Sequence, residues 1–288
     1  MIIDSHAHYS HNLYEGDFTY MDWQQDQFVI REGNRRSMLE EMKRRGICAC
    51  LEAGVSLDKA APQLEVAQTH SDYLYCSLGI HPKYCAQLPA QALEQLRARA
   101  VTHPVLAIGE AGLDYSMAPE KEERKAQKEW FIRQIELAHE LNLPLVLHIR
   151  DAYGDALEIL NQHKSLLHGG VSHCFGGDAA TAKELVALGL ALGIGARIFQ
   201  ERQLQETVTQ MPLQTLLVET DAPYIRPDIR HLPGSGKQRK KVRNSSLILP
   251  AVIEEIARLR TEASDMVEET VYRNTLRVFP GMKGGNSI

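Results

Sequence analysis

Residues 2–8 read Ile2-Ile3-Asp4-Ser5-His6-Ala7-His8, a short apolar run that ends in two histidines separated by one residue. Such a run predicts a buried strand, and alternate side chains of a strand lie on the same face. His6 and His8 should therefore point in one direction from a rigid element. Two neutral imidazoles make only half of a catalytic metal site, so further ligands must come from elsewhere in the chain.

Seven further apolar runs follow at regular intervals, at 47–51, 73–78, 105–108, 145–147, 170–172, 190–194 and 216–218. Between them lie stretches with helical spacing, at 36–45, 58–69, 89–100, 121–141, 152–163, 178–188 and 200–210; two more, 247–260 and 265–278, follow the last run. Strands that alternate with helices are parallel and joined by crossovers. Eight such units predict an α/β fold of the (β/α)8, TIM-like barrel type, with a doubly wound open sheet as the alternative.

Residues 9–33 interrupt this rhythm. They hold a third of the aromatic residues, many polar residues and no clear period. We interpret them as a long loop with one short helix, inserted at the carboxyl end of the first strand. Its aromatic side chains either pack beneath the loop, which we favour, or offer a stacking surface for unpaired bases. The sequence otherwise predicts a single barrel domain over residues 1–288.

Composition argues against several classes of protein. The net charge of -5 and pI of about 6.2 speak against binding nucleic acid through overall charge, although a local basic groove stays open. No apolar run approaches the length of a membrane span, so we expect no membrane association. A secretory signal is missing, and the five cysteines suit reduced thiols, which together predict a cytoplasmic protein. Nothing indicates an obligate protein partner.

Ligand-type side chains recur at the predicted carboxyl ends of four other strands. These residues are Glu110, His148, His173 and Asp221. In a barrel, the carboxyl ends of the strands form one rim around one pocket, so all four should converge with His6 and His8.

Four imidazoles and two carboxylates exceed the needs of one catalytic ion, which keeps a position open for water. Two divalent ions that share a bridging carboxylate fit better, and Glu110 is the natural bridge. The remaining ligands divide into His6, His8 and Asp221 for one ion and His148 with His173 for the other. The mixed ligand set suits Zn, Mn or a similar divalent ion more than Ca or isolated Mg, and the cofactor prediction is two ions of Zn, Mn or Mg.

Such a centre predicts hydrolysis by a metal-activated hydroxide. Asp221 is a candidate to take a proton from the attacking water, and Glu110 holds the two groups of ligands together. Both are therefore predicted catalytic residues.

Six short motifs stand in a recognisable order. They are His6-Ala7-His8, Gly79-Ile80-His81-Pro82, Gly109-Glu110-Ala111-Gly112-Leu113-Asp114-Tyr115, His148-Ile149-Arg150-Asp151-Ala152, His173-Cys174-Phe175-Gly176 and Glu219-Thr220-Asp221-Ala222-Pro223-Tyr224. Over nearly the whole chain, this set resembles the TatD family of metal-dependent hydrolases, in the amidohydrolase superfamily. The resemblance implies a TIM-like barrel, a divalent metal centre and 3′-to-5′ exonuclease activity on DNA. It independently supports the ligand roles given above.

The resemblance also implies residues that bind substrate, namely His81, Asp114, Tyr115, Arg150 and Tyr224. His81 would contact a substrate phosphate, with a structural cap as the alternative. The Arg150 guanidinium would bind phosphate, or else form an ion pair with Asp114 or Asp151.

Two departures from the family pattern concern substrate identity rather than chemistry. The aromatic segment 9–28 separates the first motif from the first helix, and Arg243-Asn244-Ser245-Ser246 stands where the family tends to carry Arg-Asn-Glu-Pro. The basic run 237–243 borders the pocket and is either a solvated loop or a phosphate contact.

The leading hypothesis is a metal-dependent phosphodiesterase that trims single-stranded DNA ends. The alternative uses the same metals on a small amide, lactone or phosphoester, because the ligands do not distinguish phosphorus from carbonyl carbon. A metal-bearing scaffold without catalysis is the third hypothesis, and the intact ligand set argues against it.

Overall fold

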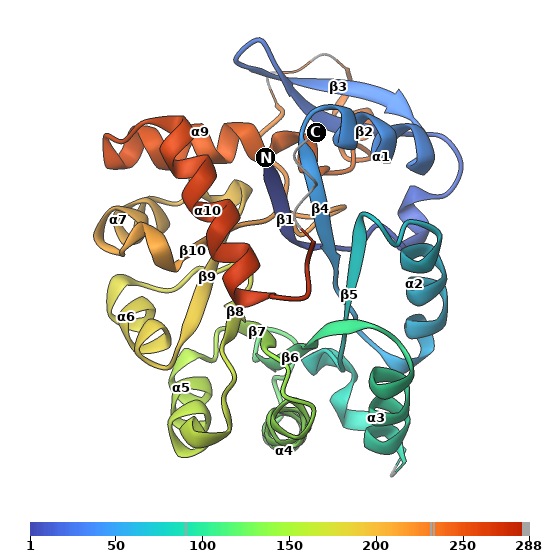
Figure 1. Ribbon diagram of the computed structural model, residues 1–288, viewed down its shortest axis with the longest axis vertical. Coiled ribbons are helices and arrows are strands. Elements are labelled where there is room, and N and C mark those ends of the chain that lie inside the picture. Colours follow the sequence, from blue (N-terminus) through green and yellow to red (C-terminus); the bar gives the residue numbers. More distant parts are fainter. Residues whose placement is uncertain (90, 231, 233, 284–288) are drawn as a thin grey trace.

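The structure is a computed structural model that describes residues 1–89, 91–230, 232 and 234–283. Eight parallel strands follow one another in chain order around a barrel, with helices outside them (Figure 1). The strands are β1 (Ile2–Ala7), β4 (Ile47–Glu52), β5 (Leu74–Leu78), β6 (Val105–Asp114), β7 (Leu145–Arg150), β8 (Gly170–Ser172), β9 (Leu190–Ile194) and β10 (Leu216–Val218). The predicted TIM-like (β/α)8 fold is confirmed.

The barrel closes where the end of β1 meets the residues that follow β10. The Asp221 N–H donates to the His6 carbonyl at 2.9 Å, and the His8 N–H donates to the Ala222 carbonyl at 2.7 Å. A bridge between Ala7 and Ala222 accompanies these bonds. The alternative of an open, doubly wound sheet is therefore wrong.

The helices lie within three residues of their predicted bounds: α1 (Arg35–Arg44), α2 (Leu57–Thr69), α3 (Ala92–Thr102), α4 (Lys121–Glu140), α5 (Tyr153–Gln162), α6 (Ala179–Ala187), α7 (Arg202–Gln210), α9 (Leu249–Arg260) and α10 (Ser264–Val278). A short α8 (Gly236–Arg239) and the 3₁₀ turns η1 (Asn12–Tyr14), η2 (Pro82–Gln87), η3 (Lys164–Leu166), η4 (Ala196–Phe199), η5 (Leu213–Thr215) and η6 (Ser246–Ile248) complete the chain. Several of these helices begin with a side-chain cap. At α1, for example, the Asn34 side chain accepts a hydrogen bond from the Ser37 N–H. In the described part of the chain, no helix has the length and hydrophobicity to cross a lipid bilayer.

The side chains on the two faces of the barrel strands belong to two different hydrophobic clusters. Ile3 and Val146 point inward and pack with Phe279, which follows α10. Ile2 and Leu147, their neighbours in sequence, point outward against the helices. Phe279 is fully buried near the start of β1, so apolar side chains fill this end of the barrel and leave the other end for polar chemistry.

Residues 9–33 do not form the predicted loop. After η1, β2 (Phe18–Gln24) and β3 (Gln27–Gly33) make an antiparallel hairpin that is paired along its whole length. Its two-residue turn, Gln25-Asp26, has left-handed φ values of 49° and 58°. The loop interpretation was wrong because this turn lacks the Asn-Gly or Asp-Gly pair that usually marks such geometry.

The aromatic side chains of the insertion are mostly part of the core. Tyr9, Tyr14, Phe18 and Tyr20 are each at most 7% exposed. Tyr14 Oη donates to the Asn244 carbonyl at 2.7 Å. The favoured packing role is therefore confirmed for these four residues.

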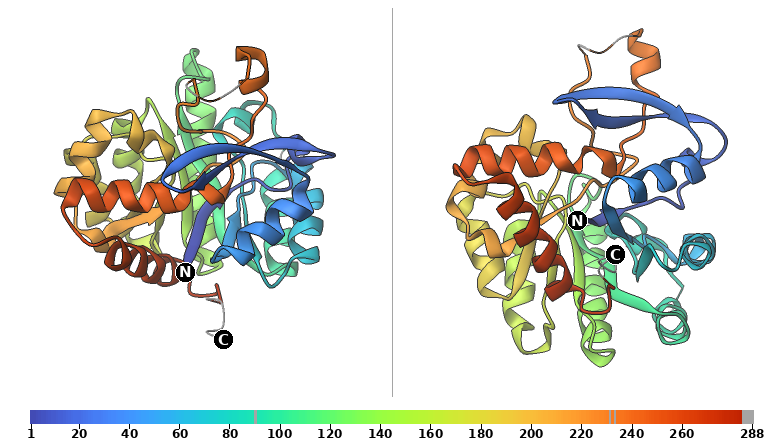
Figure 2. Two further views of the ribbon diagram at one scale, coloured as in Figure 1. Left: turned by 90° about the horizontal axis from the view of Figure 1, so that it is seen from above. Right: turned by 45° about the horizontal axis from the view of Figure 1, so that its top comes forward.

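The hairpin also holds the segment 223–243, which follows β10. The Arg243 N–H donates to the Thr19 carbonyl at 2.8 Å, and the Met21 N–H donates to the Arg243 carbonyl at 2.8 Å. Figure 2 shows the hairpin (blue) and this segment (orange) together at one end of the molecule, where they project beyond the barrel. Two stretches separated by about 200 positions thus form one structural unit at the carboxyl ends of β1 and β10.

Replacing Phe279 by Ala should lower the free energy of unfolding by about 3–5 kcal/mol, because it removes a fully buried aromatic ring from the barrel interior. Urea denaturation followed by circular dichroism measures this change. The control is Val101→Ala, whose side chain is 66% exposed and should change stability by less than about 0.5 kcal/mol. Equal effects of the two substitutions would contradict the assigned packing.

Candidate metal centre

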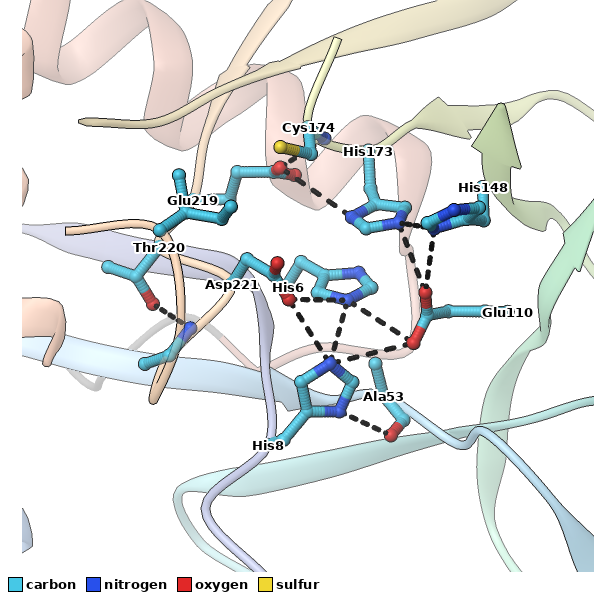
Figure 3. A network of polar contacts seen from close by, with 12 residues as sticks. His6, His8, Ala53, Glu110, His148, His173, Cys174, Glu219, Thr220 and Asp221 are labelled. Carbon is cyan, nitrogen blue, oxygen red and sulfur yellow. Dashed lines mark hydrogen bonds and ion pairs between the residues drawn. The ribbon is translucent and has the colours of Figure 1, made fainter. Parts of the chain in front are cut away.

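Six ligand-type side chains converge at the carboxyl end of the barrel (Figure 3). They are His6 and His8 around the end of β1, Glu110 in β6, His148 in β7, His173 after β8 and Asp221 after β10. His6, His8, Glu110 and His173 are buried, whereas His148 and Asp221 are partly exposed to the pocket. The structure therefore brings together all six residues that the sequence proposed as ligands.

One group of ligand atoms surrounds Glu110 Oε1. This oxygen lies 3.7 Å from His6 Nε2 and 3.5 Å from His8 Nε2. Asp221 Oδ1 lies 3.2 Å from His8 Nε2 and 3.7 Å from His6 Nε2. Both nitrogens thus lie within 3.7 Å of both carboxylate oxygens, and His6 also lies close to His173 together with Asp221.

A second group surrounds the other oxygen of the same carboxylate. Glu110 Oε2 lies 3.1 Å from His173 Nε2 and 3.4 Å from His148 Nδ1. These two nitrogens are 3.0 Å apart. Each oxygen of Glu110 therefore faces a different group, which is the geometry that a bridging ligand requires.

A distortion of β6 places Glu110 between the groups. The sequence predicted that Glu110 follows the end of this strand. In the structure the strand continues to Asp114, so Glu110 lies inside it. The register with β7 shifts between Ile108 and Ala111. Gly109 has a φ of 149°, and a Cβ atom at this position would lie 2.3 Å from the Val146 carbonyl oxygen. Simple strand alternation breaks here, which is why the apolar pattern ended the strand too early.

Hydrogen bonds orient two of the imidazoles. His8 Nδ1 lies 3.0 Å from the Ala53 carbonyl, so Nδ1 carries the proton and Nε2 keeps its lone pair for the first group. His148 Nε2 lies 3.0 Å from Asp114 Oδ2, which leaves Nδ1 for the second group. Partners of this kind fix the tautomer of a metal-binding histidine and increase its basicity.

The electrostatics of the cluster fit bound cations. Burial opposes ionisation of Glu110, but the charges of His173 and His6 hold its pKa well below the usual range. Burial opposes a charge on His8, but the hydrogen bond with Asp221 and the charge of Glu110 raise its pKa to about 9. His148 follows the same pattern, with Asp114 and Glu110 raising its pKa to about 9. Without metal, the protons of His8 and His148 thus supply the positive charge that the ionised carboxylates require. A divalent ion would displace these protons and take over their charge, which leaves each imidazole the lone pair that faces the ion.

The five predicted substrate-binding residues take different positions. His81 is buried; its Nε2 lies 3.9 Å from Glu110 Oε2, while its Nδ1 accepts the Lys83 N–H and begins η2. Tyr224 is 44% exposed, with its ring centroid 6.0 Å from that of His8.

The other three lie along β6 and β7. Asp114 is 1% exposed and contacts His148. The Tyr115 hydroxyl donates to Asp155 in α5. Arg150 is exposed and, among the described residues, forms no ion pair with Asp114 or Asp151.

Two buried carboxyl groups beside the ligands were not predicted from the sequence. Asp4 accepts hydrogen bonds from the His6 N–H at 3.1 Å and from Thr220 Oγ1 at 2.6 Å. Glu219 accepts the Cys174 N–H and lies 3.8 Å from His173 Nδ1. Asp4 lies two positions before His6, and Glu219 lies two positions before Asp221. An acidic residue within or beside an apolar run was the sequence signal that could have identified both.

Several known proteins are similar to this chain in sequence and fold. The model of the family described as TatD related DNase matches residues 3–280. The chain is 33% identical over 255 residues to the "3'-5' ssDNA/RNA exonuclease TatD" of Pectobacterium carotovorum, covering 86% of this chain and 94% of the relative. It is 30% identical over 250 residues to the Pantoea ananatis protein of the same name, covering 85% and 93%.

Solved structures agree on the fold. YJJV, a TatD homolog from Escherichia coli, superposes with a TM-score of 0.77 at 24% identity, covering 97% of this chain and 98% of that one. A hydrolase TatD family protein from Entamoeba histolytica gives a TM-score of 0.78 at 20% identity, covering 98% of both chains.

Replacing Asp114 by Asn should weaken divalent metal binding by about 10- to 100-fold, because it removes the carboxylate that orients His148. Isothermal titration calorimetry with Mn or Zn measures the affinity. Asp151→Asn is the matched control, since Asp151 is an exposed aspartate nearby and should leave the affinity unchanged. An Asp114 variant that binds metal as tightly as the control would contradict the orienting role.

Proposed function

This chain belongs to the TatD-related DNase family, and from that premise we propose that it hydrolyses single-stranded nucleic acid from the 3′ end with two divalent metal ions. The name of the relatives supports the substrate and the direction. The observation that carries the proposal is the position of Glu110, whose two carboxylate oxygens each face a separate group of ligand atoms.

His6, His8, Asp221 and Glu110 would hold one ion, and His148 and His173, together with Glu110, would hold the other. Zn, Mn and Mg are the candidate metals. When bound, two such ions provide a hydroxide nucleophile at neutral pH and stabilise the negative charge that develops on the phosphate.

The two carboxylates differ in their access to water. The Asp221 side chain is 16% exposed, whereas the Glu110 side chain is 3% exposed. Asp221 is therefore the carboxylate that can accept a proton from an attacking water. Glu110 is enclosed by imidazoles and serves to hold the two groups together.

His81 is suited to donate a hydrogen bond to a substrate phosphate. Burial lowers its pKa to about 3, although the charge of Glu110 acts against this, so the imidazole is neutral. Its Nδ1 accepts the Lys83 N–H at 3.1 Å, and the proton must therefore be on Nε2. Both sequence hypotheses for His81, a cap and a phosphate contact, are compatible because they use different nitrogens.

The other predicted substrate residues divide into two kinds. The exposed ring of Tyr224 offers a surface on which an unpaired base can stack. The exposed Arg150 guanidinium is available to phosphate. We propose that Asp114 acts through His148 and not on the substrate.

Incubation with 5′-labelled single-stranded DNA or RNA in the presence of Mg, Mn or Zn tests this function. The expected product is a ladder of progressively shorter labelled strands that requires metal. Glu110→Gln and Asp221→Asn should each reduce the rate by about 100-fold or more, with unchanged circular dichroism.

Full activity of either folded variant would contradict the assigned roles. Turnover of an activated small ester or diester without any shortening of the polymer would instead favour a small-molecule hydrolase. Loss of the labelled end as a mononucleotide would reverse the direction of attack.

A further inference from the structure

We propose that a basic hollow beside the metal centre, formed by segment 223–243, binds a backbone phosphate of the nucleic acid outside the bond that is cleaved. The inference rests on the proposed function and deepens it, because it assigns a binding site for the polymer. The hollow has a volume of about 350 Å³, and its lining includes Tyr224, Arg226, Lys240, Lys241 and Arg243. Within the described residues, its lining contains four cationic side chains and no carboxylate.

Two of these cations are held in place without an acidic partner. The Arg226 guanidinium donates to the carbonyls of Lys240 and Val242. The Arg243 guanidinium donates to the Leu13 carbonyl at 3.1 Å. Across the part of the chain that the structure describes, neither one pairs with a carboxylate. Carbonyl oxygens orient a guanidinium but leave its charge in place, so both remain available to an anion.

The two guanidinium groups also repel each other. Burial, and then the positive charge of Arg243, lower the pKa of Arg226. Lys240 and Lys241 add two exposed ammonium groups to the same hollow. A phosphate group would relieve this repulsion and match the donors.

Positive charge is concentrated in residues 226–243, whereas the chain as a whole is acidic. Residues 226–243 contain seven Lys or Arg residues and one acidic residue, Asp228, a net charge of +6 in a chain of -5. Asp228 pairs with Arg230, which does not line the hollow. A mixed, solvated charge run would carry acidic residues as well.

Tyr224 connects the hollow to the metal centre. Its ring lines the hollow and lies 6.0 Å from the His8 ring and 5.7 Å from the His11 ring, measured between centroids. A strand that has its end among the metal ligands and passes over Tyr224 therefore meets the basic hollow next. This order of contacts fits a base on Tyr224 and the phosphate of a neighbouring nucleotide in the hollow.

The basic surface continues beyond one phosphate, which favours a polymer over a free anion. A second hollow of about 400 Å³ shares Arg226 and Lys240 with the first. It adds Arg239 and also Arg230, whose charge is paired with Asp228 in the same lining. The main chain of β2 holds Arg243 through two hydrogen bonds, so the hairpin supports this surface. The insertion 9–33 and the basic run 237–243 thus both contribute to the proposed phosphate site.

The test compares two double variants that lose the same charge. Lys240→Gln/Lys241→Gln alters the hollow, and Lys164→Gln/Lys183→Gln removes two exposed lysines of η3 and α6. Fluorescence anisotropy of the metal-loaded proteins measures binding of a labelled single-stranded DNA with phosphorothioate linkages at its 3′ end, over a range of salt concentrations. Loss of one phosphate contact should reduce the slope of log K against log salt by about 0.7, which is the reduction expected for the first variant.

The control variant should keep the wild-type slope, and both variants should hydrolyse bis(p-nitrophenyl) phosphate at the wild-type rate, because this small diester does not extend into the hollow. Equal slopes for the two variants would overturn the phosphate site while leaving the exonuclease intact. A wild-type protein that hydrolyses the small diester but neither binds nor shortens DNA would overturn the proposed function, and the phosphate site with it.

Discussion

The contact between the end of β1 and the residues after β10 is the constraint on which both the barrel and the metal centre depend. The Asp221 N–H bonds the His6 carbonyl, and the His8 N–H bonds the Ala222 carbonyl. These two bonds close the sheet and, in the same step, bring the Asp221 carboxylate to 3.2 Å from His8 Nε2. A buried carboxyl group, Asp4, joins the same two chain segments through His6 and Thr220. The geometry of the site is thus a direct consequence of barrel closure.

Glu110 completes the centre from the opposite wall of the barrel. The cluster joins two carboxylates and four imidazoles in a space largely closed to water, where unpaired charge is costly. Outer partners such as Asp114 and the Ala53 carbonyl select which imidazole nitrogen faces inward. The ligand set is therefore oriented before any ion binds, which reduces the free energy lost in ordering it.

The fold and the ligands were predictable because both depend on simple periodic rules. Strand and helix spacing gave the barrel, and polar residues at strand ends gave His6, His148 and the other ligands. The hairpin at 18–33 was not predictable in the same way, because its turn lacks glycine and its strands are partly covered on both faces. The extension of β6 was missed where its register shifts beside Gly109. An acidic residue beside an apolar run was a signal for Glu219, but its contacts with Cys174 and His173 depend on segments that are distant in sequence.

The central claim is that Glu110 lies between two metal ions. Anomalous diffraction from crystals loaded with Mn or Zn tests it most directly. We predict two anomalous peaks, about 3.5–4 Å apart and one on each side of the Glu110 carboxylate. One would lie among His6, His8 and Asp221, and the other beside His148 and His173. A single peak at full occupancy, or two peaks of which neither contacts Glu110, would contradict the account.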